Sequence, residues 1–243
     1  MNSGMYAALT GNLAAMRRLD VLSNNLANSN TLGFKADQLQ FESVLAGASK
    51  TAGGGSPSET PVFSGERFST NYSSGPLRQT GNSLDIAIAG DGFFVVNTPD
   101  GVAYTKQGNF QRDANGKLVT VDGFEVQGRG AINISGGRVE IDEKGGVLVD
   151  GVQTGALDIV DFPKPYALQK MGNALFVPVD PQTVPQPATT AQVKQGFLED
   201  SNVNVILEMA RLIETSRYFE SCQNAVRSYD DIASKAANDI GKL

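Results

Sequence analysis

The sequence predicts an α+β protein, in which N- and C-terminal helices pair as an antiparallel coiled coil and flank a mainly antiparallel β middle domain. Both ends of the 243-residue chain carry apolar residues at helical spacing, whereas the middle alternates short apolar segments with Asp-Gly and Asn-Gly turns. Because both helices join the middle by their inner ends, they can lie side by side and antiparallel.

Composition divides the chain into five segments. We expect an inner assembly domain, built from both ends of the chain, and a β-rich outer domain. The segments are an N-terminal helix (1–35), a loose linker region (36–82), the β-rich outer domain (83–180), an extended connector (181–200) and a C-terminal helix (201–243).

The N-terminal helix is predicted over about 3–27, because apolar residues recur every three or four positions. They are Met5, Leu9, Leu13, Met16, Leu19, Leu22 and Leu26. Three Asn follow at 24, 25 and 28, although Asn is unfavourable inside helices. Such a row suits side-chain bonding between packed helices, and a fraying helix end is the alternative. Gly33 is a natural left-handed stop.

The segment after Phe41 is predicted to be loose. Residues 53–58 read Gly-Gly-Gly-Ser-Pro-Ser, which is the composition of a flexible loop. The triple glycine does not indicate a phosphate-binding loop, because no Gly-Lys-Ser/Thr follows it.

The middle, 83 to about 179, is predicted to be β-structure. Leu84, Ile86 and Ile88 alternate with other residues as in a half-buried strand, and 93–96 is a short, fully apolar strand. Further strands are expected at 118–121, 124–126, 139–141, 147–149 and 157–160. Hairpin turns are expected at the Asp-Gly or Asn-Gly pairs 91–92, 100–101, 115–116, 122–123 and 150–151. This spacing favours a Greek-key sandwich or an irregular barrel.

The C-terminal helix is predicted over about 203–240, roughly 57 Å at 1.5 Å per residue. Leu212, Phe219, Val226, Ala233 and Ile240 recur every seven residues, and a second heptad series follows three places later. The second series is Thr215, Cys222, Tyr229, Ala236 and Leu243. A stripe this narrow on so long a helix requires partners, and we expect both ends of the chain to become ordered only on assembly.

Composition excludes several classes of function. The net charge of −6 argues against nucleic acid or an anionic membrane as partner. No apolar run is long enough for direct membrane insertion, and no cleavable signal is visible. One Cys allows no internal disulfide, and the absence of His removes the commonest metal ligand and general base.

Three patterns suggest chemistry, and each has a simpler explanation. Residues 113–116, Asp-Ala-Asn-Gly, resemble part of a calcium loop but lack its later acidic ligands, so a hairpin turn is favoured. Cys222 has no His as partner base and is expected to be a packing residue. Asp85 and Asp91 could form a carboxylate pair, but carboxylates near turns are common. We therefore expect no catalytic residue, no metal and no cofactor.

Several segments together resemble the bacterial flagellar rod and hook proteins. Residues 19–28, LDVLSNNLAN, with 31–35, TLGFK, resemble the N-terminal signature of that family. Residues 84–94, 104–110 and 116–120 resemble its central motif, and 196–205, GFLEDSNVNV, with 208–209 and 217–220 its C-terminal signature. The resemblance covers nearly the whole chain in family order.

The resemblance implies a structural subunit of the basal-body rod, without enzymatic activity. Family members leave the cell through the flagellar type III export apparatus and assemble helically with copies of themselves and other rod proteins. The rod spans the periplasm and transmits torque from motor to hook. Length and a single middle domain are most similar to the proximal-rod member, and a distal-rod subunit is the alternative.

The assembly interface is predicted on the two helices, with a packing role and with the Asn residues linking neighbouring subunits. Its residues are Leu9, Leu13, Met16, Leu22, Asn24, Asn25, Leu26, Asn28, Leu212, Phe219, Val226 and Ile240. The rival hypotheses are an extracellular ligand-binding β module on a helical stalk and, more distantly, a wall-cutting hydrolase using Asp85 or Asp91.

Overall fold

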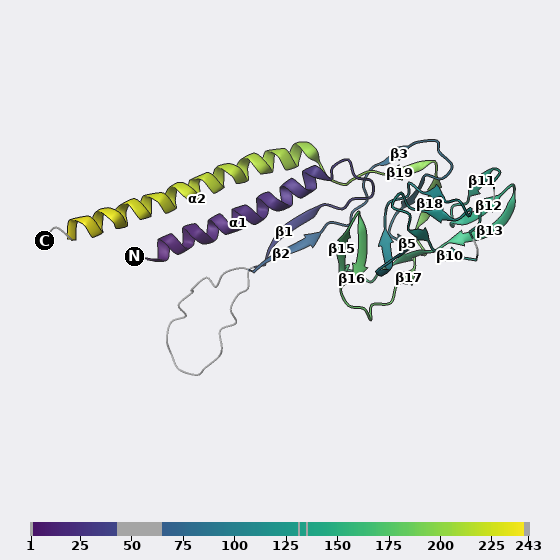
Figure 1. Cartoon of the computed structure of the whole chain (residues 1–243), viewed down its shortest axis with the longest axis horizontal. Helices are drawn as coiled ribbons and strands as arrows, with labels where there is room; N and C mark the ends of the chain where they lie inside the picture. The colour runs from purple at the N-terminus through teal and green to yellow at the C-terminus, as the bar shows by residue number, and fades with distance from the viewer. Residues whose placement is uncertain (1, 43–64, 131, 135, 241–243) are drawn as a thin grey trace. The chain divides into compact units, whose positions relative to one another are not determined.

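The structure is a computed structural model that describes residues 2–42, 65–130, 132–134 and 136–240 (Figure 1). It is α+β, as predicted, and the chain forms two compact units. One unit comprises Met1–Asn25, Asp37–Asn71 and Ile206–Leu243, and the other comprises Leu26–Ala36 and Tyr72–Val205.

The first unit contains the helices α1 (Asn2–Ala27) and α2 (Val205–Ile240), whose bounds lie within two residues of those predicted. They lie side by side and antiparallel (Figure 1), since Asn25 near the end of α1 contacts Glu208 near the start of α2. The same unit contains the antiparallel strands β1 (Asp37–Glu42) and β2 (Gly65–Thr70), with Leu39 opposite Phe68.

These two strands and β3 (Leu77–Gln79) lie in the segment 36–82, which was predicted to be a loose linker, so the described part of that segment contains regular strands. Gln38-Leu39-Gln40-Phe41 has the period-2 alternation of such a strand. The Gly-rich loop predicted at 53–58 lies outside the described residues.

The second unit is built from antiparallel strand pairs. Its largest sheet has the order β15-β16-β6-β5-β9-β8-β7, and β14 pairs with both β5 and β17. These strands are β5 (Phe93–Thr98), β6 (Gly101–Thr105), β7 (Gln111–Arg112), β8 (Leu118–Val119), β9 (Glu125–Val126), β14 (Ile159–Asp161), β15 (Leu168–Gly172), β16 (Leu175–Pro178) and β17 (Gln186–Pro187). The order has two open ends, so this sheet is not a closed barrel.

Smaller sheets complete this unit. One has the order β10-β13-β12-β11, and two further pairs are β18-β4 and β19-β3. Their strands are β3 (Leu77–Gln79), β4 (Ile86–Ala89), β10 (Gly128–Arg129), β11 (Val139–Ile141), β12 (Gly146–Val149), β13 (Val152–Leu157), β18 (Gln192–Gln195) and β19 (Phe197–Glu199). The predicted extended connector at 181–200 therefore contributes three strands.

Strand β5 lies between two apolar cores, because successive side chains of a strand point to opposite faces. Phe94 and Val96 belong to the larger core, which also takes residues from β4, β11 and β12. Phe93 and Val95 belong to a smaller, aromatic core with Tyr104, Phe162 and Phe176. Strand β4 is buried on both faces rather than half-buried, since Ile86, Ala87 and Ile88 are all buried, and β18 pairs with it along one edge.

The predicted Asp-Gly and Asn-Gly turns are present. Glycines 92, 101, 116, 123 and 151 all have positive φ, from 80° to 135°, a conformation that costs glycine little. Four of these turns join antiparallel neighbours, and the pair at 91–92 joins β4 to β5, which are not paired with each other. Gly33, predicted as a left-handed stop after α1, has φ 64°.

Candidate functional site

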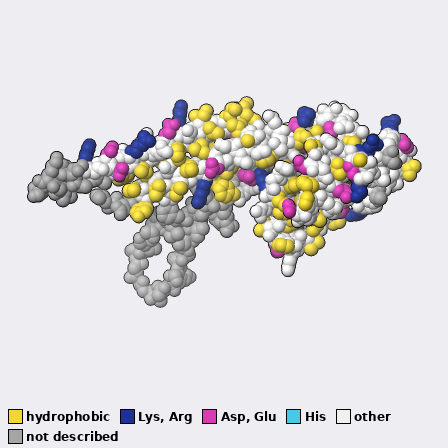
Figure 2. Space-filling view, in the orientation of Figure 1, with side chains coloured by type: hydrophobic (Ala, Val, Ile, Leu, Met, Phe, Trp, Pro, Cys, Tyr) yellow, Lys and Arg dark blue, Asp and Glu magenta, His cyan; other side chains and the backbone are white. Residues whose placement is uncertain are grey.

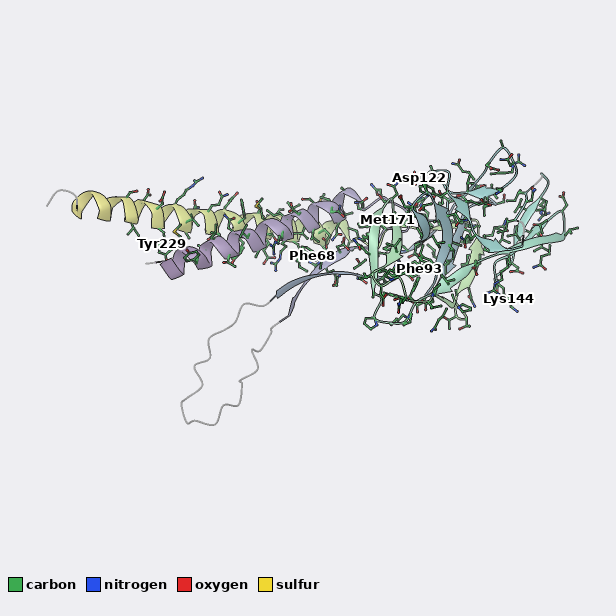
Figure 3. All side chains as sticks on the ribbon, turned by 60° about the horizontal axis from the view of Figure 1, so that its bottom comes forward. Phe68, Phe93, Asp122, Lys144, Met171 and Tyr229 are labelled. Carbon is green, nitrogen blue, oxygen red and sulfur yellow. The ribbon has the colours of Figure 1, made fainter. Side chains whose placement is uncertain are left out.

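Two glycines of α1 lie in close contact with side chains of α2. Gly11 lies against Tyr218 and Cys222, where an added Cβ would be 3.0 Å from the Tyr218 hydroxyl and 3.3 Å from the Cys222 sulfur. Gly4 lies against Tyr229, whose ring occupies the space that a side chain would need (Figure 3). Because glycine has no side chain, the aromatic side chains of α2 approach the backbone of α1 closely at these two positions.

The predicted apolar stripe of α1 divides between two environments. Leu22 is buried, together with Ala15. The side chains nearer the start of the helix are 44–52% exposed: Leu9, Leu13 and Met16. The stripe was predicted from large apolar residues, whereas the helices pair through small ones, so an apolar face of α1 is uncovered in the single chain (Figure 2).

The predicted heptad of α2 is partly covered. Thr215 is buried, and Leu212, Phe219 and Val226 are half-buried. The side chain of Ile240 lies outside those described. The apolar residues at the helix start are 48–83% exposed: Ile206, Met209 and Ile213. Both helices therefore carry apolar surface that the single chain leaves open to solvent.

The three predicted Asn residues have different surroundings. Asn25 is buried, and its amide donates to the Asp37 carbonyl at 2.8 Å, accepts from the Asp37 N–H at 2.9 Å and donates to Glu208 at 3.2 Å. Its side chain thus joins α1, β1 and α2 within one chain. Asn24 is exposed, and Asn28 accepts a bond from Thr31.

A buried ion cluster connects segments far apart in the sequence. The Lys35 ammonium is 2.5 Å from Glu199 Oε1 and donates to the Ser73 carbonyl at 2.8 Å. Lys106 lies 3.7 Å from Glu199 Oε2 and donates to the Gly90 carbonyl at 2.8 Å. All three charged side chains are at most 3% exposed. The cluster holds two cations and one anion, away from water.

Burial lowers the pKa of Lys106 to about 8, because a desolvated ammonium is unfavourable. Glu199 opposes this shift and the Lys35 charge adds to it. Among the residues that the structure describes, Glu199 Oε2 has no hydrogen-bond partner, so the ion pair with Lys35 satisfies only one oxygen of the carboxylate. The cluster therefore includes a weakly compensated cation at Lys106.

Sequence analysis did not assign a role to any member of this cluster. Each nevertheless lies in a segment that carried the family resemblance: Lys35 in 31–35, Lys106 in 104–110 and Glu199 in 196–205. Asn202, next to the cluster, accepts from the Ala36 N–H at 2.7 Å and donates to the Ser73 carbonyl at 3.0 Å. The signatures thus meet around one buried ion pair.

The residues considered for chemistry have structural surroundings. Asp113 Oδ1 accepts from the N–H groups of Asn115 and Lys117 in the turn between β7 and β8, which confirms the predicted hairpin. Asp91 pairs with Lys164 at 2.6 Å, which lowers the pKa of Asp91, and Asp85 accepts from Asn82 at 3.0 Å.

Within residues 2–42, 65–130, 132–134 and 136–240, no group of three or more His, Cys, Asp and Glu side chains is placed to hold a metal ion. Neither of the helices described there is both long and apolar enough to cross a membrane.

Three family models match the chain in sequence order. They are "Flagella basal body rod protein" at 5–35, "Flagellar hook protein FlgE/F/G D1 domain" at 87–149 and "Flagellar basal body rod FlgEFG protein C-terminal" at 194–239. The first and third matches cover most of α1 and of α2, together with Lys35 and Glu199. The second match contains Lys106.

Curated relatives are similar over their full length. The flagellar basal-body rod protein FlgF of Rhizobium meliloti (strain 1021) is 34% identical, with 99% of both chains covered. FlgF of Caulobacter vibrioides is also 34% identical, over 100% of both chains. The flagellar basal-body rod protein FlgG of Bacillus subtilis (strain 168) is 33% identical, over 98% of this chain and 99% of that protein.

Proposed function

Because this chain belongs to the flagellar basal-body rod protein family, as a structural subunit of the basal body, we propose that it assembles helically through its two terminal helices. The observation that carries the proposal is the uncovered apolar face of α1. Soluble monomers rarely expose contiguous apolar patches of this kind unless a partner covers them. Copies of this chain and other rod proteins are the partners.

The helices act in this proposal as an antiparallel coiled coil that forms the inner assembly domain, with the β-rich unit as the outer domain. Their contacts support it, since Gly4 and Gly11 are seven residues apart and face Tyr229 and Cys222, which are also seven apart. Close-packed interfaces of this kind deform little, as a rod that transmits torque requires.

The proposed interface between subunits keeps the predicted residues except Asn25. The exposed residues of α1 contact a neighbouring subunit, and the half-buried residues of α2 serve both the helix pair and its neighbours. These residues are Leu9, Leu13, Met16, Asn24, Asn28, Leu212, Phe219 and Val226, with Leu22, Leu26 and Ile240 extending the two stripes.

A proximal position in the rod is supported by the full-length similarity to two FlgF proteins. A distal position is the alternative, because FlgG of Bacillus subtilis is nearly as similar. Delivery by the flagellar type III export apparatus completes the proposal, since the rod lies outside the cytoplasm.

The test replaces apolar surface without disturbing the single chain. Leu9→Gln with Leu13→Gln should abolish rod formation and motility in a host that lacks its own copy of the gene. Both residues are about half exposed, so the unfolding midpoint of the purified chain should change little. Asp20→Asn, an exposed change on the same helix, is the matched control. Normal motility of the double variant would refute the assembly role of this face.

A further inference from the structure

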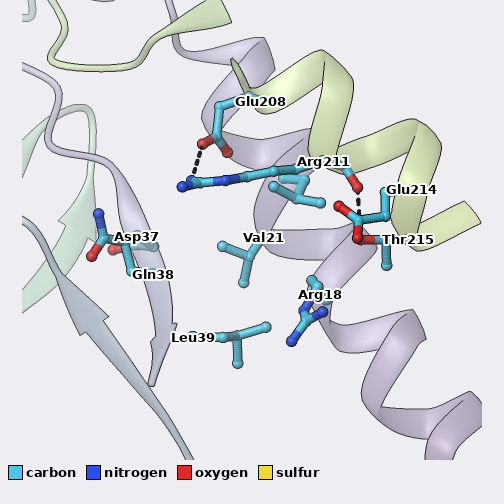
Figure 4. A pocket seen from close by; sticks show the side chains of 10 residues that line it. Arg18, Val21, Asp37, Gln38, Leu39, Glu208, Arg211, Glu214 and Thr215 are labelled. Carbon is cyan, nitrogen blue, oxygen red and sulfur yellow. Dashed lines mark hydrogen bonds and ion pairs between the residues drawn. The ribbon is translucent and has the colours of Figure 1, made fainter. Parts of the chain in front are cut away.

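A groove in the first unit lies where α1, β1 and α2 meet, and it encloses about 340 Å³ (Figure 4). Three apolar side chains line it: Val21 and Leu22 from α1, and Leu39 from β1. Charged side chains of both signs also line it: Arg18, Asp37, Glu208, Arg211 and Glu214. The groove thus combines an apolar surface with three carboxylates and two guanidinium groups.

The apolar surface continues beyond the groove along the β1–β2 hairpin. Phe68 lies directly opposite Leu39 in the register, so both side chains are on the same face of the hairpin. Phe68 is 58% exposed. An occupant of the groove would therefore also cover an aromatic side chain that the single chain leaves open.

The charges around the groove restrict its occupant. A charged side chain entering it would meet groups of its own sign as well as of the opposite sign, so the lining gives neither a cationic nor an anionic side chain a clear electrostatic advantage. A phenol suits this surface better, since its ring covers apolar surface while its hydroxyl donates to a carboxylate and accepts from a guanidinium.

One exposed tyrosine near the start of α1 meets this requirement. Tyr6 is 65% exposed, more than Tyr218 or Tyr229, which lie against the glycines of α1. Its neighbours Met5 and Leu9 are also exposed, and positions 1–16 contain no charged residue. Insertion of Met5, Tyr6 and Leu9 would therefore desolvate no charged side chain, which keeps the cost of burial low.

Tyr6 cannot reach the groove of its own chain. It precedes the α1 residues of the groove, Arg18 to Leu22, by 12 to 16 positions on one helix. At 1.5 Å per residue, that separation is about 18–24 Å. A Tyr6 side chain in the groove must come from another molecule.

We propose that the groove receives Tyr6 and its apolar neighbours from a second copy of this chain. The contact joins different surfaces of the two molecules, so it leaves one free groove and one free Tyr6 and can repeat without closing. This inference rests on the proposed self-assembly and specifies one of its contacts, between the start of α1 in one subunit and the base of the helix pair in the next.

Disulfide trapping in the full chain tests the contact. In a Cys222→Ser background, Tyr6→Cys is combined with Gln38→Cys, whose side chain lines the groove from β1. The concentrated protein is oxidised and analysed by non-reducing electrophoresis and mass spectrometry. We expect a ladder of cross-linked species from the double variant, and dimers only from a mixture of the two single variants.

A matched control pairs Tyr6→Cys with Val152→Cys, an exposed position on β13, and should give no ladder. Tyr6→Ala should reduce self-association measured by sedimentation at least tenfold, while Tyr6→Phe should retain the apolar part of it. Self-association without a 6–38 cross-link, or a cross-link to a different protein, would overturn this contact and leave the proposed function intact. Failure of the chain to self-associate would refute a second copy as the occupant.

Discussion

The buried Lys106 gives the β-rich unit an unusual pH dependence of stability. Its pKa is about 8 in the folded chain, against an ordinary value of 10.5 that the unfolded chain regains. Between these values the unfolded state binds more protons, so the free energy of unfolding rises with pH. One pKa unit corresponds to about 1.4 kcal/mol, and the rise between pH 7 and 9.5 is therefore about 2 kcal/mol.

The assay is urea unfolding followed by far-ultraviolet circular dichroism, at constant ionic strength, from pH 7 to 9.5. The upper limit avoids the titration of tyrosine in the unfolded chain, because burial raises the pKa of Tyr104 and Tyr166 and would reduce stability at higher pH. Lys106→Met removes the titrating group and should make the profile flat over this range.

Lys144→Met is the matched control, because Lys144 is exposed on a turn (Figure 3) and its replacement should leave the rise intact. A flat profile in the unmodified chain would refute the reasoning. So would an undiminished rise in Lys106→Met, since the effect would then belong to another group.

Three further predictions concern the helices. Asn25→Ala should cost roughly 1–3 kcal/mol of unfolding free energy, because it removes the hydrogen bonds of a buried side chain to Asp37 and Glu208. Ser23→Ala, an exposed change two residues away, should change little, and equal effects would refute the assignment. Phe219→Ala should lower the free energy of unfolding of the single chain by less than the roughly 3–5 kcal/mol lost when a fully buried Phe is truncated, since Phe219 is half-buried. It should impair rod formation more than it impairs the stability of the single chain, which chemical unfolding and a motility assay compare. Amide hydrogen exchange in the dilute chain should be fast over 2–13 and 220–240 and slower around Asn25 and Glu208, which are buried. Uniform protection of both helices in a proven monomer would contradict the expectation that assembly orders them.

Local signals in the sequence predicted both helices and seven of the nineteen described strands. Periodicity predicted both helices to within two residues, and four of the five Asp-Gly or Asn-Gly pairs lie in hairpin turns. The pairing face of α1 was not predictable in the same way. Large apolar residues dominate a periodicity argument, whereas the close contact depends on Gly4 and Gly11, which add nothing to an apolar stripe.

The ion cluster could not be predicted from local sequence patterns, for a different reason. Lys35, Lys106 and Glu199 are ordinary charged residues in their own segments, and only the tertiary fold buries them together. Similarly, Asn25 was recognised as unusual inside a helix, but its partners come from β1 and α2. Sequence patterns identified where an interaction was needed, and the fold determined which groups make it.

The Lys35–Glu199 pair also has a consequence for the time course of folding. Its members are separated by 164 positions, so their contact closes a loop that includes most of the β-rich unit. Closing so long a loop costs chain entropy before the contact returns any stabilisation, and such contacts make folding slow. A chain that emerges with its N-terminus first cannot make this contact until residue 199 has followed. The segments around Lys35 and Glu199 therefore become fixed to each other only after most of the chain has emerged.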